Sequence, residues 1–265
     1  MVLIYVNKEK DIDGAWYNLL CDCLKKEKIE YQHLTDDDFD KKIDADAIFV
    51  LGGDGTILAL TEFSVKNNTP IIAVNAGKVG FLTEFERIQT EHAVKSFVNN
   101  TLVKDARTVI QVEIDGKVYY ALNDIYVERL FDKNSAGVIV DLFVEVDGGY
   151  KFNMRGDGLV VSTPTGSTAY SVCSGGAVVA PDANVLMLTP ISAMPLSLKP
   201  FVYNDNKECF ITITKNVLAG LFVDGKYICN LTFGNKISVK KSSKTLVFLR
   251  ERTTNLYNKL TKKLN

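Results

Sequence analysis

A single carboxylate, Asp54, stands among three glycines in the segment VLGGDGT, residues 50 to 56, directly after the apolar run ADAIFV. Glycines between a strand and a helix let backbone N–H groups approach a phosphate, and the start of the helix adds favourable partial charge. They also leave the carboxylate without bulky neighbours, which suits contact with a reacting hydroxyl group. We therefore predict a phosphate-binding loop with Asp54 beside a hydroxyl; the alternative is a plain turn in which Asp54 caps the helix. The segment matches neither the Walker A motif nor GxGxxG.

A second glycine-bearing segment, VNAGKVGFLTE at residues 74 to 84, follows the strand-like run PIIAV. Because it also comes directly after a strand, we expect it at the same edge of a sheet as the first segment. Asn75, Gly77 and Gly80 would bring amide and backbone donors toward that edge, and Phe81 offers a flat surface to a nucleobase. The alternative for Phe81 is a place in the ordinary apolar core.

Hydroxyl groups are dense in a third segment, MRGDGLVVSTPTGSTAYSVCSGG at residues 154 to 176. Its Ser and Thr residues are too many for a buried strand, and its Gly and Pro residues are too ordered for a linker. We predict a polar binding loop in which Arg155 meets a phosphate or carboxylate, Asp157 accepts from an amide and Tyr170 stacks on a nucleobase. A plain surface loop is the alternative. Patterns such as GxSxG, SxxK and HExxH do not accompany these serines, so nucleophilic hydrolysis has little support.

Strands and helices must position these segments, and the first hundred residues alternate the two. Apolar side chains at positions 16, 19, 20, 23 and 24 recur at helical spacing. VLIYV, IEYQHL, ADAIFVL and PIIAVNA are typical of strands, and TILALTEFSVKNN and EHAVKSFVNN of helices. This alternation predicts an α/β domain over residues 1–100 with a mostly parallel sheet, whose ligands lie beyond the carboxyl ends of the strands.

From Thr101 the apolar pattern changes to a period of two residues. In TVIQVEIDGKVYYAL, Asp115 and Gly116 separate two alternating runs, which predicts a hairpin turn. Further strand candidates are GVIVDLFVEVDGGYKF, GLVVST, CFITITK, LAGLFVDGKYICNL, KISVKK and TLVFL. We predict a β-rich, mostly antiparallel domain over residues 101–249. The tail TTNLYNKLTKKLN is expected to form a short helix, and residues 250–265 to return to the first domain.

Composition restricts the function classes. The chain has 265 residues, 46% apolar and 24% charged, as expected of a globular protein with a sizeable core. Its 31 basic and 32 acidic residues nearly cancel, so no bulk charge favours nucleic acid or an anionic membrane. Five cysteines without a CxxC pair and only two histidines argue against a protein metal site such as structural zinc. Without a leader pattern or an apolar run of about 18 residues, a cytoplasmic location is expected.

Four segments, GGDGT, VNAGKVGFL, ALND and DGLVVSTPTGSTAYSVCSGGAVVAP, together resemble the NAD kinase family in order and spacing over most of the chain. GGDGT alone is weak, because diacylglycerol kinases, sphingosine kinases and 6-phosphofructokinases carry similar strings. The long Ser/Thr-rich block is the specific part of the resemblance. It implies phosphorylation of the 2′-hydroxyl of the adenosine ribose of NAD by ATP with Mg²⁺, giving NADP, and an α/β domain followed by a β-rich, NAD-binding domain.

The resemblance also implies roles for individual residues. Asp54 would be the general base or orienting acceptor for the ribose hydroxyl. Phe81 and Tyr170 would lie beside the adenine, and Asp157 would hold the nicotinamide carboxamide. The substrate-binding residues that it implies are Gly53, Gly55, Thr56, Asn75, Phe81, Asn123, Asp124, Arg155, Asp157, Thr168, Ala169, Tyr170, Ser171, Cys173 and Lys226.

In that set, Asn123 and Asp124 would bind ribose hydroxyls, and Thr168 with Ala169 would lie near the adenine edge. Arg155 would reach a ligand, including one bound to a neighbouring subunit, since family members commonly form dimers or tetramers. This chain departs from the family in two places. A Glu is common where Asp124 stands, and Gln is common where Lys226 stands, so substrate preference stays open.

Two other functions remain as alternatives. A lipid kinase of the diacylglycerol type would share the GGDGT string, but the chain lacks an apolar or basic membrane-docking stretch. A non-catalytic NADP-binding regulatory protein would keep the binding loops, whereas the presence of Asp54 favours catalysis. The choice between ATP and polyphosphate as donor, and between NAD and NADH as acceptor, is open at this stage.

Overall fold

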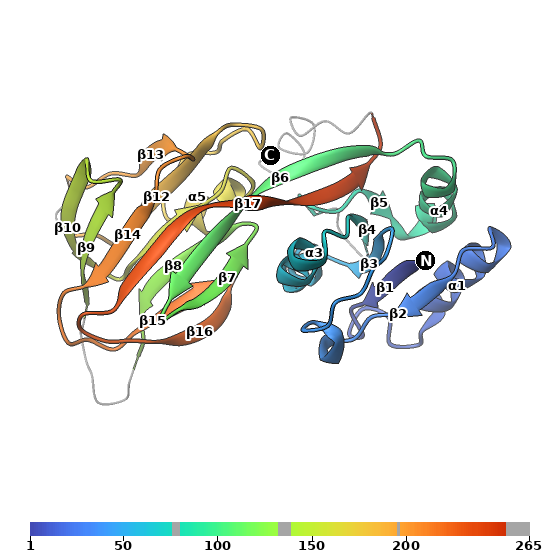
Figure 1. Cartoon of the computed structure of the whole chain (residues 1–265), viewed down its shortest axis with the longest axis horizontal. Helices are drawn as coiled ribbons and strands as arrows, with labels where there is room; N and C mark the ends of the chain where they lie inside the picture. Colours follow the sequence, from blue (N-terminus) through green and yellow to red (C-terminus); the bar gives the residue numbers. More distant parts are fainter. Residues whose placement is uncertain (76–79, 132–138, 195–196, 253–265) are drawn as a thin grey trace. The chain divides into compact units, whose positions relative to one another are not determined.

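The computed structural model describes residues 1–75, 80–131, 139–194 and 197–252. The chain divides into two compact units (Figure 1). Among the described residues, the first contains Met1–Ala106 and residues 246–252, and the second lies within Arg107–Thr245. Two long strands, β6 (Val103–Ile114) and β17 (Lys236–Arg250), have residues in both units.

The first unit contains a parallel sheet in the order β4-β3-β1-β2. Its strands are β1 (Val2–Val6), β2 (Tyr31–His33), β3 (Ile48–Gly52) and β4 (Ile71–Asn75). The short β5 (Phe85–Glu86) and the end of β17 also pair with β4 in parallel. The predicted parallel sheet is confirmed.

Helices with an apolar face pack on this sheet. Trp16, Leu20 and Leu24 of α1 pack with Phe49 and Leu51 of β3 in one buried cluster. The unit's helical segments are α1 (Ala15–Lys26), η1 (Asp36–Asp38), α2 (Asp54–Ala59), α3 (Thr61–Asn67), η2 (Arg87–Gln89) and α4 (Thr90–Val98).

The order of strands creates a switch point between β1 and β3. The chain leaves β1 through α1 and adds β2 on one side, whereas it leaves β3 through α2 and α3 and adds β4 on the other side. The loops that follow β1 and β3 therefore diverge at the carboxyl edge of the sheet. In α/β folds this is the usual place for a ligand.

One helix prediction was wrong. TILALTEFSVKNN was expected to form a single helix, but the structure has α2 and α3, which meet at Leu60. The N–H of Leu60 donates to the carbonyl of Ile57 at 3.0 Å, the tighter spacing that often ends a helix. This bend leaves the side chain of Leu60 fully buried.

The second unit contains an antiparallel six-stranded sheet in the order β13-β12-β11-β8-β15-β16. Its strands are β8 (Asp124–Arg129), β11 (Gly158–Ser162), β12 (Val185–Ile191), β13 (Phe201–Asn204), β15 (Ala219–Val223) and β16 (Lys226–Leu231). On one face of β8, Ile125 and Val127 are fully buried. The alternate residues of β8 lie on the other face.

A second antiparallel layer packs on that buried face. It contains β6, β7 (Lys117–Ala121), β9 (Val140–Val146), β10 (Tyr150–Gly156), β14 (Cys209–Ile213) and β17. Val144 and Ile211 of this layer share one apolar core with Ile125 and Val127. The predicted antiparallel, β-rich fold is therefore confirmed.

The hairpin predicted at Asp115 and Gly116 is also confirmed, with φ of 50° and 74°. Positive φ at both turn residues is the geometry that Asp-Gly turns favour between antiparallel strands. Other strand predictions were incomplete. KISVKK and TLVFL belong to the single strand β17, and β8, β12 and β13 were not predicted. β8 and β13 have only three consecutive apolar or aromatic residues each, and β12 is continuously apolar up to Thr189 and Pro190, so none of them shows a period-two signal.

The hydroxyl-rich segment contains two short helical turns, η3 (Thr165–Thr168) and α5 (Tyr170–Cys173). The helix predicted in TTNLYNKLTKKLN lies outside the described residues. No helix in the described part of the chain is long and apolar enough to cross a membrane.

Candidate active site

The glycine loop of the first unit lies between β3 and α2. A Cβ atom at Gly52 would lie 2.3 Å from Oγ1 of Thr56, so only glycine fits there without movement. Thr56 is buried, and its Oγ1 accepts a hydrogen bond of 3.2 Å from Nδ2 of Asn7. The loop after β1 therefore supports the loop after β3.

Asp54 is held by the second glycine-bearing segment. Its Oδ2 accepts from the N–H of Phe81 at 2.8 Å, and its Oδ1 accepts from the N–H of Leu82 at 3.1 Å. A Cβ atom at Gly80 would lie only 1.9 Å from Oδ1 of Asp54, so a glycine is needed for this approach. The N-cap of α2 is Gly53, without a side-chain cap. The alternative in which Asp54 caps the helix is therefore wrong.

The two glycine-bearing segments meet because their strands are neighbours. Gly52 at the end of β3 is in register with Asn75 at the end of β4, and Asn75 is buried. Phe81 is half-buried and does not belong to the buried core cluster of this unit. Gly77 lies outside the described residues. The expected meeting of both segments at one sheet edge is confirmed.

In the second unit, one carboxylate organises the backbone around Asn123. Asp224 accepts from the N–H groups of Leu122 and Asn123 at 2.8 Å each, and from that of Asp124 at 3.2 Å. Asp224 is not among the residues predicted from the sequence, because Asp-Gly at this position predicts only a hairpin turn. Asp224 does have the turn's positive φ of 47°. Besides forming this turn, Asp224 fixes the backbone of Leu122, Asn123 and Asp124, which lie about a hundred positions earlier in the chain.

The hydroxyl-rich segment holds the same stretch from the other side. Oγ1 of Thr163 donates to the carbonyl of Leu122 at 2.6 Å and accepts from the N–H of Gly166 at 3.0 Å. A Cβ atom at Gly166 would lie 2.0 Å from the carbonyl oxygen of Asn123. The Thr-Pro-Thr-Gly turn thus positions Asn123 and Asp124 by close backbone contact rather than forming a plain surface loop.

Asp124 is a buried carboxylate, with 4% of its surface exposed. Burial, together with the nearby charge of Asp224, raises the pKa of Asp124 to about 7, against a smaller opposite effect of the Tyr170 N–H. Ser162 is its cross-strand partner in β11. Within the described residues, Oδ2 of Asp124 and Oγ of Ser162 have no hydrogen-bond partner. Buried polar atoms without a partner are unusual in folded proteins and need an explanation.

Tyr170 lies over the same face of the sheet as Asp124. Its ring meets Tyr126 edge-on with centroids 4.9 Å apart, and its hydroxyl donates to Glu128 at 3.2 Å. Burial, followed by the charge of Glu128, raises the pKa of Tyr170 to about 12. Tyr126 stacks in turn on Phe222 at 4.7 Å. The half-buried Tyr170 is therefore part of an aromatic group with a remaining open side.

Both charged residues selected near the start of the hydroxyl-rich segment carry ion pairs. Nε of Arg155 lies 3.1 Å from Asp141, and Asp157 lies 2.9 Å from Nε of Arg129. A ligand that used Arg155 or Asp157 would share them with these partners. The hydroxyl of Ser171 is buried against Oγ1 of Thr189 at 2.8 Å, so it holds α5 on β12.

The other selected residues of this unit are less enclosed. Thr168 and Ala169 are half-buried where η3 gives way to α5, whereas Cys173 and Lys226 are exposed. Gly55 in the first unit is exposed as well. The roles of these residues stay predictions.

Comparison with known proteins decides the family. The ATP-NAD kinase N-terminal domain model matches residues 5–102, and the ATP-NAD kinase C-terminal domain model matches residues 122–251. The chain belongs to the ATP-NAD kinase family. An NAD kinase of Caldicellulosiruptor saccharolyticus is 31% identical over 264 residues, which are 100% of this chain and 99% of that relative. An NAD kinase of Thermococcus sibiricus is 35% identical over 225 residues, covering 84% and 80% of the two chains.

Solved structures of ATP-NAD kinase relatives have the same fold. The structure of an Archaeoglobus fulgidus NAD kinase in complex with ATP has a TM-score of 0.79 and 25% identity, and covers 100% of this chain and 98% of its own. The structure of yeast NADH kinase complexed with NADH has a TM-score of 0.82 and 22% identity, and covers 100% and 87%. The second likeness concerns the fold alone.

Proposed function

We propose that this ATP-NAD kinase transfers the terminal phosphate of ATP to the 2′-hydroxyl of the adenosine ribose of NAD, with Asp54 as the acceptor of the hydroxyl proton. Family membership makes the chain an enzyme, an NAD kinase that uses ATP. The observation that carries the role of Asp54 is its carboxylate, fixed by the N–H groups of Phe81 and Leu82 directly beside the glycine loop.

In the proposed reaction the ribose oxygen attacks the γ-phosphorus of ATP while the bond to the bridging oxygen breaks and ADP leaves. The hydroxyl proton passes to Asp54. A carboxylate is a weak base toward a hydroxyl, so the proton leaves late, or together with phosphoryl transfer. Catalysis then depends mainly on positioning, which is what two backbone donors on one carboxylate supply.

Binding of NAD is assigned in this proposal to the second unit. Asn123 and Asp124 would contact ribose hydroxyls, which suits the orphaned Oδ2 of Asp124 and Oγ of Ser162. Tyr170 would stack on adenine through its open side. The half-buried Thr168 and Ala169 lie next to Tyr170 in the chain, where an adenine edge would come close.

A divalent cation is part of the proposal because phosphoryl transfer from ATP needs its phosphate charge neutralised. Among the residues that the structure describes, no three His, Cys, Asp or Glu side chains are grouped to hold a metal. Mg²⁺ binds readily through nucleotide phosphates with few protein ligands, so it would arrive with ATP. A homodimer or homotetramer and a cytoplasmic location are also proposed, and sedimentation would test the first.

The decisive experiment is a turnover assay of the purified protein with NAD or NADH as acceptor and ATP or polyphosphate as donor, with Mg²⁺. NADP formation would be followed by an NADP-specific dehydrogenase, so that only 2′-phosphorylation gives a signal. Tight NADP binding without turnover would instead favour the regulatory alternative. Phosphorylation of diacylglycerol but not of NAD would favour the lipid kinase.

A further inference from the structure

The loop between β1 and α1 carries a lysine whose ammonium group lies against the glycine loop. Nζ of Lys10 is 3.1 Å from the position that a Cβ atom on Gly53 would take. Apart from Gly53 and its chain neighbours, the described residues place no other heavy atom within 4 Å of that position. A positive charge therefore lies directly over the open side of Gly53.

Strand order explains why a residue so early in the chain reaches this loop. β1 and β3 are parallel neighbours with Val6 opposite Leu51, and the N–H of Asn7 donates to the carbonyl of Leu51 at 2.9 Å. The loops that contain Lys10 and Gly53 thus leave adjacent strand ends, on the two sides of the switch point. A ligand at this switch point would contact both loops.

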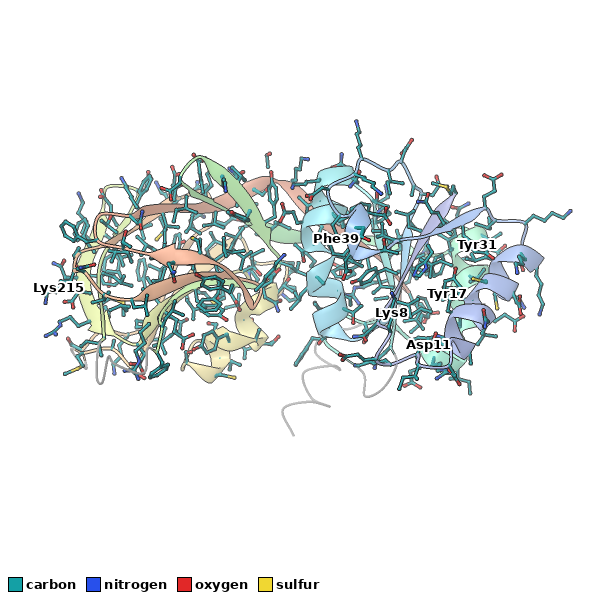
Figure 2. All side chains as sticks on the ribbon, turned by 90° about the horizontal axis from the view of Figure 1, so that it is seen from below. Lys8, Asp11, Tyr17, Tyr31, Phe39 and Lys215 are labelled. Atoms are coloured by element: carbon teal, nitrogen blue, oxygen red, sulfur yellow. The ribbon has the colours of Figure 1, made fainter. Side chains whose placement is uncertain are left out.

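Hydrogen bonds fix the backbone of the lysine loop. The N–H of Lys10 donates to the carbonyl of Asn7 at 3.0 Å, and the side chain of Asn7 bonds Thr56. The buried Asp11, labelled in Figure 2, accepts from the N–H groups of Trp16 and Tyr17 at 2.9 and 2.8 Å. N–H groups in the first turn of α1 are therefore satisfied by Asp11, and Lys10 places an ammonium group of this loop beside Gly53.

The charge of Lys10 has no carboxylate partner in the described part of the chain. The nearby Asp54 uses both carboxylate oxygens on the backbone of Phe81 and Leu82. A phosphate is a matching partner, because a lysine ammonium is a compact charge with three donors.

We propose that Lys10 binds the phosphates of the donor nucleotide at the glycine loop. This inference rests on the proposed function. Gly53 directly precedes Asp54, which would lie beside the acceptor hydroxyl, and the transferred phosphoryl group must lie in line with that hydroxyl. Phosphates that lie against Gly53 and Lys10 then belong to ATP rather than to the diphosphate of NAD.

The test compares Lys10→Met and Lys10→Arg with a matched control, Lys8→Met. Lys8, labelled in Figure 2, is an exposed lysine of the same loop that makes no contact with the Gly53 position. Calorimetry without NAD would measure the Kd of ATP in the presence of Mg²⁺ and the Kd of adenosine, which lacks the phosphates. Steady-state assays would give KM for ATP and for NAD. Melting temperatures would show that each variant is folded.

Lys10→Met should weaken ATP binding by roughly 10- to 100-fold, the range for a lost hydrogen bond to a charged group. Binding of adenosine and KM for NAD should stay within about 2-fold, since neither uses this ammonium group. Lys10→Arg should restore most of the ATP affinity, and Lys8→Met should resemble the wild type.

Two results would overturn the inference: ATP binding by Lys10→Met within about 2-fold of Lys8→Met, or a loss confined to NAD. The proposed function has a separate readout, because it fails if the folded wild type makes no NADP. If the wild type makes NADP and Lys10→Met binds ATP normally, the inference about Lys10 fails and the proposed function stands. If the wild type makes no NADP but Lys10→Met weakens its ATP binding, the proposed function fails and the contact between Lys10 and the nucleotide stands.

Discussion

Replacement of Asp54 by Asn should have a small effect on stability and a large effect on turnover, and the structure allows the size of both to be predicted. The carboxylate accepts two backbone hydrogen bonds, and an amide keeps one oxygen and turns an NH₂ group toward the other N–H. Loss of one such bond costs about 1.5 to 3 kcal/mol when the N–H is buried. Asp54 is only half-buried, so water reaches the site and we expect about 1 to 2 kcal/mol.

That loss of stability corresponds to a drop in melting temperature of roughly 2 to 8 °C for a chain of this size. It would leave nearly all molecules folded under assay conditions. Loss of a general base should lower turnover by about 10²- to 10⁴-fold, which is roughly 3 to 5.5 kcal/mol of barrier. The two effects therefore differ enough to be measured independently.

The assay would combine steady-state turnover, melting temperature and the Kd of NAD for wild type, Asp54→Asn and the control Asp37→Asn. Asp37 is an exposed carboxylate of η1. NAD affinity should remain within about 3-fold, because Asp54 would contact only one hydroxyl of NAD and the other proposed contacts are made by Asn123, Asp124 and Tyr170. A folded Asp54→Asn enzyme with turnover within about 5-fold of wild type would refute the reasoning and move the proton acceptor to another group.

Three further predictions use the same geometry. Gly80→Ala should lower turnover at least about tenfold, because the new Cβ would lie 1.9 Å from Oδ1 of Asp54 and displace it. In the control Gly149→Ala the new Cβ would meet only a carbonyl oxygen at 3.8 Å, so turnover should not change. The pKa of Asp124 is about 7 in the folded chain and 3.8 in an unperturbed carboxyl group. The folded state therefore binds the proton more tightly, and the free energy of unfolding should fall as pH rises between these values. Asp124→Asn should flatten that dependence in melting curves from pH 4 to 8, and an unchanged slope would contradict the shifted pKa. Tyr170→Ala should weaken NAD binding by roughly 5- to 150-fold and Tyr170→Phe much less, whereas a large fall in melting temperature with normal affinity in the folded fraction would assign Tyr170 to packing alone.

Local sequence was enough to predict elements that depend on near neighbours. Asp-Gly between alternating runs predicts a two-residue turn because both residues tolerate positive φ, as at Asp115 and Gly116. Apolar spacing likewise predicted the strand and helix alternation of the first unit. It failed at Leu60, where α2 ends and α3 begins within a segment whose apolar spacing favours one helix.

The candidate site was predicted in its parts but not in its contacts. The glycines and Asp54 were identified because their residue types suit phosphate chemistry. Asp224 was missed because its sequence context, Asp-Gly, is already explained by a hairpin turn. Lys10 was missed for a similar reason, since a lysine in a polar loop has no local feature that separates it from Lys8.

The sequence by itself determined the family, the two kinds of domain and the residue types at the glycine loop, because motifs and periodicity are local properties. Only the tertiary structure decided that Asp54 bonds Phe81, which is 27 residues away, and that Asp224 holds the backbone of Asp124, which is 100 residues away. The order of parallel strands places Lys10 against Gly53. These contacts join distant segments through strand pairing, and the hydrophobic pattern within one strand does not specify which strand becomes its neighbour.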